Sequence, residues 1–388
     1  MNSTSILITG DFAPQGRVLE SIQKEKAQGI FNDFQDYLCS SDINITNLEC
    51  PLVSKAEKIQ KTGPYLKAPV ESINILKEGK FDIVTLANNH ILDYGFDGLK
   101  TTIETCKKNG IKTVGGGLSK NEVSKPLILI KNQKKIGLIN IAEEEFSVVS
   151  TGDYGANPFD ISVVYKTITD LKGKVDVIIV IAHGGHEFYK YPSPEIVKRY
   201  RLLIEFGVDA VVGHHPHCHS GFEKYNNGLI FYSLGNFSFD WPEMKKSGWN
   251  DGYAVKLNIE QDNSINYEII PYKQGDTEPG VRLLKAEEKK RFLKELNKIN
   301  DVIQSEELLM NEWQKFVDFN IDQYLTLIQP TSRIVKAFQN RKILPKIFFT
   351  KERNRLLLLN LIRCESHREM LTNVLKNYGD KSTKKTGL

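Results

Sequence analysis

Short apolar runs and segments of helical spacing alternate along most of the chain. The runs are rich in Val and Ile, which is typical of strands buried on both faces of a parallel sheet. The runs that we interpret as strands cover residues 5–9, 43–46, 81–87, 113–114, 177–182 and 210–212. The segments of helical spacing cover residues 18–37, 70–77, 97–109, 161–171 and 194–206. This order of elements predicts an α/β fold.

A second group of strands has a different pattern. Residues 127–130 and 136–141 flank a polar turn and predict a β-hairpin. Three further apolar runs, at residues 229–233, 253–259 and 265–271, succeed one another without an intervening helix. Strands that are consecutive in this way favour antiparallel pairing, so we expect a mixed sheet system.

Beyond residue 284 the pattern is helical only. One apolar stripe consists of Phe292, Leu293, Leu296, Ile299, Val302 and Ile303. We therefore expect a sheet domain over residues 1–283 and a helical C-terminal region over residues 284–378 that packs on it. We expect a disordered tail over residues 379–388, which are polar and basic.

Histidines concentrate where two of the apolar runs end. Six of the eight histidines lie between residues 183 and 219, at positions 183, 186, 214, 215, 217 and 219. In open α/β sheets, ligands bind beyond the carboxyl ends of the strands. Because imidazole is a ligand for Mn, Zn and Fe, this clustering favours a metal site over a set of hydrogen-bonded loop histidines.

Other ligand-type residues stand at the ends of the earlier strands. Asp11, Glu49, and Asn89 with His90 each come directly after an apolar run, as His183 and the 214–217 histidines do. Such a mixed set of carboxylate, amide and imidazole ligands suits Mn, Zn or Fe better than Ca or Mg alone. The sheet would bring these ends to one edge, so the sequence predicts one divalent-metal pocket.

Composition and charge narrow the function classes. Hydrophobic residues make up 40% and charged residues 26% of the chain, as in soluble globular proteins. A net charge of +4 gives no argument for nucleic-acid binding. The charge is uneven, because residues 333–388 carry 14 Lys and Arg against 4 Asp and Glu. We interpret this basic segment as a solvated face, with peripheral contact to anionic lipid or an acidic polymer as the alternative.

The cysteines and the N-terminus indicate an intracellular setting. The five cysteines are widely spaced and lack CxxC spacing, so they predict neither a disulfide framework nor a thiolate zinc site. We find no basic segment leading into an apolar stretch at the start, and no run of about 18–20 apolar residues. We expect a cytoplasmic location. The oligomeric state stays open.

Several ordered motifs resemble one bacterial family. They read GDFAPQGR at 10–17, TNLECPL at 46–52, LANNHILDYGFDGL at 86–99, AHGGHEFY at 182–189, VDAVVGHHPH at 208–217 and FYSLGNFSFD at 231–240. In these motifs the chain resembles the CapA family of capsule and poly-γ-glutamate biosynthesis proteins, within the calcineurin-like metallophosphoesterase superfamily. The resemblance covers roughly residues 5–275.

The resemblance implies a four-layer α/β/β/α sandwich with one or two divalent metal ions between its sheets. The metal ligands that it implies are Asp11, Glu49, Asn89, His183, His215 and His217. It also implies that His90, oriented by Asp93, exchanges a proton with the departing oxygen. The substrate contacts that we expect beside an anionic substrate are Arg17, His186, Glu187 and Asn236.

Some assignments around the site stay open. An extended His-x-His segment presents His215 and His217 on one side, but His214 with His217 is the alternative pair. His186 and Glu187 are equally well read as a hydrogen-bonded loop pair. We expect His219 and His367 to be bystanders and Cys218 to be buried and inert. Further substrate candidates are Tyr65, Lys67 and Tyr189.

The chain departs from the wider superfamily at its first motif. The usual Asp-x-His is replaced by Asp11-Phe12-Ala13, and Glu49 stands where a bridging Asp is usual. A single metal, or a weak second one, and reduced phosphatase activity are consistent with these changes. The resemblance implies a metal-dependent hydrolase that acts on a phosphoester or polymer-linked substrate. The alternatives are a non-hydrolytic accessory protein of anionic-polymer synthesis or export, and proton-transfer chemistry on a peptide-like substrate.

Overall fold

The structure is a computed structural model that describes residues 3–23, 29–149, 153–241, 243–244, 248–328 and 352–385. The chain divides into two compact units. The first comprises Met1–Ile59 and Tyr65–Leu309, and the second comprises Gln60–Pro64 and Met310–Leu388. Each unit is described by itself.

The first sheet of the larger unit is mixed and has eight strands. Its order is β16-β15-β14-β1-β2-β3-β4, and β13 pairs with β1 beyond this path. Strands β13, β1, β2, β3 and β4 are parallel, whereas β14, β15 and β16 pair antiparallel. The bounds are β1 Thr4–Phe12, β2 Ile43–Leu48, β3 Ile83–Thr85, β4 Lys112–Val114, β13 Asn236–Ser238, β14 Asp251–Ile259, β15 Ile265–Gln274 and β16 Val281–Leu283.

The second sheet has six strands in the order β11-β12-β10-β9-β7-β6. The four inner strands are parallel, and the predicted hairpin is confirmed as the antiparallel pair β6–β7. The bounds are β6 Leu127–Lys131, β7 Lys134–Ala142, β9 Val177–His183, β10 Ala210–His214, β11 Phe222–Tyr225 and β12 Gly228–Phe231. Two short strands, β5 Gly116–Gly117 and β8 Gly155–Ala156, form a separate ribbon.

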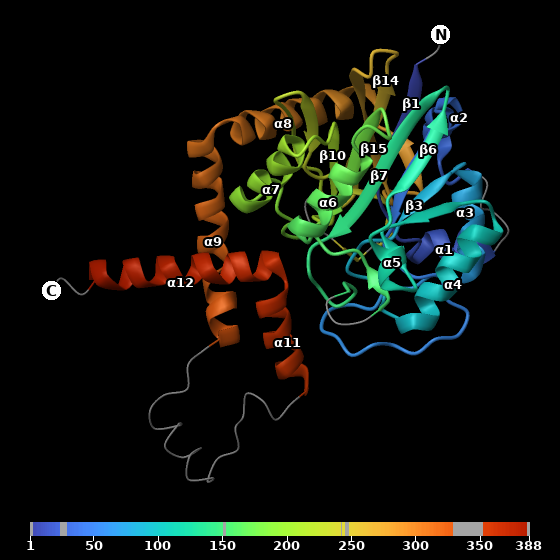
Figure 1. The fold of residues 1–388 in the computed structure, drawn as a ribbon. Helices are drawn as coiled ribbons and strands as arrows, with labels where there is room; N and C mark the ends of the chain where they lie inside the picture. Colours follow the sequence, from blue (N-terminus) through green and yellow to red (C-terminus); the bar gives the residue numbers. More distant parts are fainter. Residues whose placement is uncertain are drawn as a thin grey trace. The chain divides into compact units, whose positions relative to one another are not determined.

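Alternation of side chains along the strands sorts the core into layers. On β1, Ile6 and Ile8 join a cluster that also contains Ile179 of β9, so this cluster lies between the two sheets. Leu7 points to the opposite face of β1, into a cluster with helices α2, α3 and α4. On β9, Val180 points outward into a cluster with α6 and α7. The fold is therefore the predicted four-layer α/β/β/α sandwich (Figure 1).

The helices of the larger unit begin at recognisable signals. The Asp160 side chain accepts hydrogen bonds from the first turn of α6, and Ser193 caps α7, which has Pro194 in its first turn. The helix bounds are α1 Gly16–Gln23, α2 Gln35–Ser40, α3 Ile73–Glu78, α4 Gly95–Lys108, α5 Lys120–Val123, α6 Ile161–Leu171, α7 Pro194–Glu205 and α8 Ala286–Gln304, with 3-10 turns at Asn32–Phe34 and Val70–Ser72.

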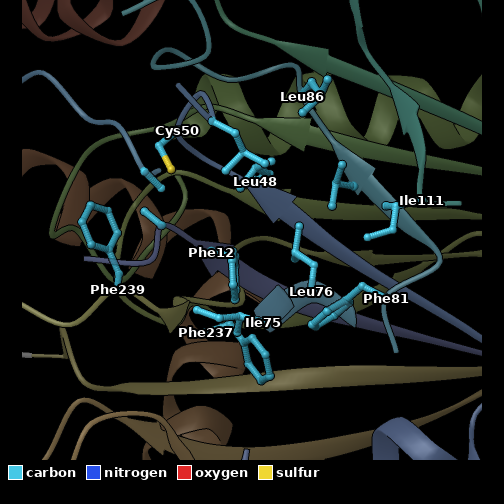
Figure 2. Close-up of a cluster of buried hydrophobic side chains, with 14 of the residues drawn as sticks. Phe12, Leu48, Cys50, Ile75, Leu76, Phe81, Leu86, Ile111, Phe237 and Phe239 are labelled. Carbon is cyan, nitrogen blue, oxygen red and sulfur yellow. The ribbon is translucent and has the colours of Figure 1, made fainter. Parts of the chain in front are cut away.

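An aromatic cluster lies on the helix-covered face of the first sheet, directly below the strand ends (Figure 2). Phe237 of β13 packs against Phe31, Phe34 and Phe81, with ring centroids 5.0–6.0 Å apart. Phe12 and Leu48 are fully buried in the same cluster. Phe12 lies on the helix face although Ile6 and Ile8 face the other sheet, because the pairing register of β1 shifts between Ile8 and Asp11. This irregularity reverses the alternation and leaves Asp11 facing the second sheet, where it accepts a hydrogen bond from the His215 amide.

Two predicted elements have different boundaries in the structure. The single helix predicted over residues 18–37 is wrong, because α1 ends at Gln23, Gly29 has a φ of +88°, and a 3-10 turn and α2 come after it. Residues 24–28 of that prediction lie outside the described residues. The strand predicted over 81–87 is only Ile83–Thr85, since the next residues form the turn that carries Asn89 and His90.

Helix α8 belongs to the sheet unit rather than to a separate helical region. Phe292 and Leu296 join the cluster between the sheets, while Ile299 and Ile303 pack with the outer cluster beside α7. The stripe predicted from the sequence thus packs on the sheets as expected, but the boundary between units lies at residue 310 instead of 284. Helix α8 belongs to the first unit because its apolar face packs in these two clusters.

Apart from the irregular segment Gln60–Pro64, the elements of the second unit that the structure describes are helices. They are most of α9 Glu306–Ile328, together with α11 Glu352–Arg363 and α12 Glu365–Lys385. Tyr324 Oη lies 2.7 Å from His367 Nδ1. Helix α12 continues to Lys385, so the structure differs from the disordered tail predicted over 379–388 as far as that residue. Gly379 stands within this helix and does not end it.

The inter-sheet cluster should dominate the stability of the larger unit. We expect Ile179→Ala, at a fully buried position of β9, to lower the free energy of unfolding by about 2–5 kcal/mol. Ile130→Ala is a matched control, because Ile130 lies on β6 and is 71% exposed. Urea denaturation monitored by circular dichroism measures both. Equal losses in the two variants would contradict the assignment of the core.

Candidate metal centre

The carboxyl ends of parallel strands from both sheets meet at one place. Asp11 on β1 lies level with Asn47 on β2 and with Asn236 on β13. In the other sheet, His183 at the end of β9 lies level with His214 at the end of β10. Hydrogen bonds cross between the sheets here, since the His215 amide donates to Asp11 Oδ2 over 3.2 Å.

Two glycines allow the strand ends to come this close. A Cβ on Gly10 would lie 1.9 Å from the carbonyl oxygen of Gly235, and one on Gly213 would lie 2.1 Å from that of Tyr232. Both glycines stand one residue before the polar strand ends. The close backbone packing that only glycine permits therefore sets the position of Asp11 and of the histidine segment.

A first group of ligand atoms forms around His183. Its Nε2 lies 3.1 Å from Asn89 Oδ1, 3.1 Å from His215 Nδ1 and 3.6 Å from Glu49 Oε1. Glu49, His183 and His215 each offer a ligand atom within one space 4.8 Å across, and all three are buried. The amide oxygen of Asn89 faces the same point.

A second group shares one member with the first. Asp11, Glu49 and His217 also offer ligand atoms within 4.8 Å of one another. His217 Nε2 lies 3.6 Å from Glu49 Oε1, and His217 Nδ1 lies 3.7 Å from Asp11 Oδ2. Glu49 therefore stands between the two groups, where a carboxylate can bridge two ions.

The electrostatics of these groups suit a divalent cation. Asp11 and Glu49 are fully buried, and a buried carboxylate is costly unless positive charge compensates it. Burial, and next the neighbouring His215 and His214, hold the pKa of His183 well below its ordinary value, so the ring is neutral and can act as a ligand. Two carboxylates, three imidazoles and one amide oxygen form a donor set that fits Mn, Zn or Fe.

His214 and His215 have different surroundings. His214 Nε2 lies 3.0 Å from the carbonyl oxygen of Thr9 on β1, so His214 links the second sheet to the first. His215 instead joins the first ligand group. The segment is not extended as the sequence argument assumed, because His215 has a φ of +101° and His217 a φ of +56°. This unusual backbone directs the two rings into the pocket.

His90 and Asp93 lie where the sequence placed them relative to each other. His90 Nδ1 is 2.7 Å from Asp93 Oδ2, and both side chains are buried. The same oxygen accepts a 2.7 Å hydrogen bond from the Leu66 amide. Asn88 Oδ1 accepts from the His90 amide. The turn between β3 and α4 thus holds His90 in one orientation beside the ligand groups.

Arg17 and Asn236 have partners that differ from the predicted substrate. The Arg17 guanidinium donates to both carboxylate oxygens of Asp240 and to the carbonyls of Gly275, Asp276 and Thr277. The Asp240 carboxylate raises the pKa of Arg17, which is committed to a structural ion pair. Asn236 Oδ1 lies 3.0 Å from His217 Nδ1, so Asn236 orients a ligand ring. Their roles as substrate contacts stay predictions.

The remaining candidates are more dispersed. His186 is buried three residues beyond His183, whereas Glu187 is exposed. Tyr65 donates to the carbonyl of Ile59, and the Lys67 ammonium lies 5.2 Å from the centre of the Tyr94 ring. Tyr189 is buried. Of the two expected bystanders, His367 contacts Tyr324 in the second unit and His219 packs on Phe292.

Burial explains why two nearby groups are not reactive. It lowers the pKa of His219 to about 4 and raises the pKa of the Cys218 thiol to about 12. His219 is therefore neutral, and Cys218 is a thiol rather than a thiolate. This agrees with the expected inert role of Cys218.

Sequence analysis missed two polar side chains of the centre. Asn47 Nδ2 donates to Asp11 Oδ1 over 2.8 Å, and Asn47 Oδ1 accepts from Thr85 and Asn88. Glu143 is buried directly after β7, and one carboxylate oxygen lies 3.8 Å from His215 Nε2. The signal for Glu143 was available, because it stands just beyond the apolar run 136–141, as the recognised ligands stand beyond theirs.

Aromatic rings enclose one side of His217. The ring centroids of Trp249, Phe239 and Phe188 lie 5.2, 5.5 and 6.3 Å from that of His217. They keep water from this side of the ligand and lower the local dielectric, which strengthens attraction between the carboxylates and a cation.

The fold and the ligand set together define a class. It is a four-layer α/β/β/α sandwich whose strand ends carry buried carboxylate, amide and imidazole groups that could hold a divalent metal ion. Within this class, the chain belongs to the bacterial capsule synthesis protein family PGA_cap, whose model matches residues 5–241.

Two curated relatives are similar over most of the chain. PGA biosynthesis protein CapA of Bacillus subtilis (strain 168) is 29% identical over 295 residues, which cover 73% of this chain and 75% of that protein. Capsule biosynthesis protein CapA of Bacillus anthracis is 29% identical over 310 residues, which cover 76% of this chain and 73% of that protein. Among solved structures, Haemophilus influenzae NAD nucleotidase (NadN) aligns with 15% identity and a TM-score of 0.39, covering 76% of this chain and 62% of that one.

The different roles of His214 and His215 can be tested by substitution. We expect His215→Ala to bind less metal, because it removes a member of the first ligand group. His214→Gln is the matched control, since glutamine keeps a donor for the Thr9 carbonyl and should leave metal content unchanged. Elemental analysis of purified, metal-reconstituted protein measures both. Full metal content in His215→Ala would remove it from the ligand set.

Proposed function

We propose that the protein is a metal-dependent hydrolase that acts on a phosphoester or polymer-linked substrate in capsule, poly-γ-glutamate or exopolysaccharide biosynthesis. One observation carries the proposal: two buried ligand groups share Glu49, beside a histidine that a carboxylate orients. A protein that only binds a metal ion would not need a further histidine, His90, held by Asp93 beside the ligand groups.

The residues of the chain have separate tasks in this proposal. Asp11, Glu49, Asn89, His183, His215 and His217 would hold one or two ions. When bound, such ions supply Lewis acidity and an activated water molecule. Because Asp93 accepts a hydrogen bond from His90 Nδ1, His90 Nε2 is the atom that would exchange a proton with the departing oxygen. Asp93 also stabilises the protonated ring.

The surroundings of His90 suit an anionic substrate. The loop that donates the Leu66 amide to Asp93 also carries Lys55, Lys58 and Lys67, and all three are exposed. A pocket of about 720 Å³ lies at this loop, and its lining includes Lys55, Tyr94 and Phe96 together with the carboxylates of Glu57 and Asp97. The attraction for a phosphorylated or carboxylate-rich substrate would therefore come from the exposed lysines of the loop, Lys58 and Lys67, rather than from the pocket lining.

A non-hydrolytic accessory role is the second candidate, and one observation favours it. Ala13 stands where the superfamily has a ligand histidine, and it is buried in the apolar cluster of the first sheet. The second ligand group therefore offers one imidazole, His217. A weakly held ion there would bind an anionic polymer without efficient turnover.

Among the described residues, no helix has the length and hydropathy needed to cross a bilayer. The basic segment from residue 333 onward carries part of its charge outside the described residues, so a peripheral contact with anionic lipid stays a proposal based on sequence.

The role of His90 separates the two candidates. We expect Mn²⁺-loaded protein to hydrolyse a generic phosphodiester, and His90→Ala to keep its metal while losing turnover by about 10²–10⁴-fold. His367→Ala, a histidine substitution in the second unit, should retain full activity. Metal analysis and release of nitrophenol measure the two properties. Metal-loaded protein that shows no turnover on phosphoesters would favour the accessory role.

A further inference from the structure

We infer that Glu143 is a positioning residue for His215, and that it makes His215 a metal ligand through Nδ1. The inference rests on the proposed function, because it concerns the same centre. It adds a residue for which neither the motifs nor the ligand groups provide a role.

The backbone fixes Glu143 beside the ligand strands. It stands directly after β7, and its amide donates a 2.9 Å hydrogen bond to the carbonyl of His183. Its side chain packs over Gly184, where an added Cβ would meet the Glu143 carboxyl group at 3.3 Å. Glu143 is 5% exposed, so its carboxylate is held between β7 and the His183 turn rather than in solvent.

The two ring nitrogens of His215 face different groups. Nδ1 lies 3.1 Å from His183 Nε2, which is the atom that faces Glu49 and Asn89. Nε2 faces Glu143 Oε1 at 3.8 Å, a distance at which the carboxylate attracts the ring N–H although the hydrogen bond is not yet formed. Nδ1 is therefore on the ligand side of the ring, and Nε2 is on the carboxylate side. Glu143 itself belongs to none of the groups of ligand atoms found among the described residues.

A histidine that binds a metal through one nitrogen presents the other as an N–H donor. A carboxylate that accepts this hydrogen bond fixes the tautomer, holds the ring in place and makes the ligand nitrogen more basic. His215 has particular need of such support, because its φ of +101° lies outside the regions that non-glycine residues favour. Glu143 also adds a third buried carboxylate to Asp11 and Glu49, which strengthens the attraction for a divalent cation.

Two substitutions at Glu143 separate the effect of charge from that of the hydrogen bond. Glu143→Gln keeps an acceptor of the same shape, whereas Glu143→Ala removes it. Glu144→Gln is the matched control, since Glu144 is the next residue and is half-buried. We expect the Kd for Mn²⁺, measured by calorimetric titration of metal-free protein, to rise about tenfold in Glu143→Gln and up to about 100-fold in Glu143→Ala. Glu144→Gln should match wild type.

A second readout distinguishes positioning of the ligand from general stability. Co²⁺-loaded Glu143→Gln should show an altered visible absorption spectrum, because the orientation and basicity of one ligand ring change. Thermal unfolding of the metal-free variants should match wild type and exclude misfolding. An unchanged Mn²⁺ affinity and an unchanged Co²⁺ spectrum in Glu143→Gln would overturn the inference while leaving the metal centre intact. Wild-type protein that binds neither ion would instead overturn the proposed function and this inference together.

Discussion

The structure depends on the burial of two carboxylates where two sheets meet. Asp11 and Glu49 are inaccessible to solvent, and the nearest groups include imidazole rings. Buried negative charge of this kind is stable only when a cation or a dense set of donors compensates it. The amides of Asn47 and His215 donate to Asp11, but they supply no net positive charge. A divalent cation would supply the missing positive charge, and the neutral nitrogen and oxygen ligands around the carboxylates would help to hold it.

Apolar packing on the opposite faces of the strands sets the direction of these polar side chains. Phe12 and Leu48 lie in the aromatic cluster beneath the first sheet, and each is the strand neighbour of a carboxylate. In the second sheet, Ala182 packs outward before His183. Strand alternation in β2 and β9, and the register shift before Asp11 in β1, therefore leave the polar side chains facing one pocket. Helices α6 and α7 cover the outer face of the second sheet.

Local spacing rules were enough to predict much of the fold and the site, whereas features that depend on distant partners were missed. Periodicity and spacing predicted the strand ends at Asp11 and His183, whereas the four-layer architecture and the role of His90 with Asp93 came from the family resemblance. The role of Arg17 could not be predicted, because its partner Asp240 is 223 residues away in the chain. Glu143, like Glu49, follows directly after an apolar run, so the same criterion could have selected it. It stands outside the motifs that carry the resemblance. The helix predicted over 18–37 failed because helical spacing persists across the break at Gly29.

The positive φ angles of His215 and His217 have a consequence for the ligand-free protein. A non-glycine residue in this region stores conformational strain, on the order of 1–3 kcal/mol for each position. Coordination would offset that strain, so the Gly213–Ser220 turn should open more often when no ion is bound. Amide hydrogens in this turn would then exchange faster with solvent than those of the strands on either side. Binding of a metal ion would slow this exchange, so the exchange rate would indicate whether the pocket holds an ion.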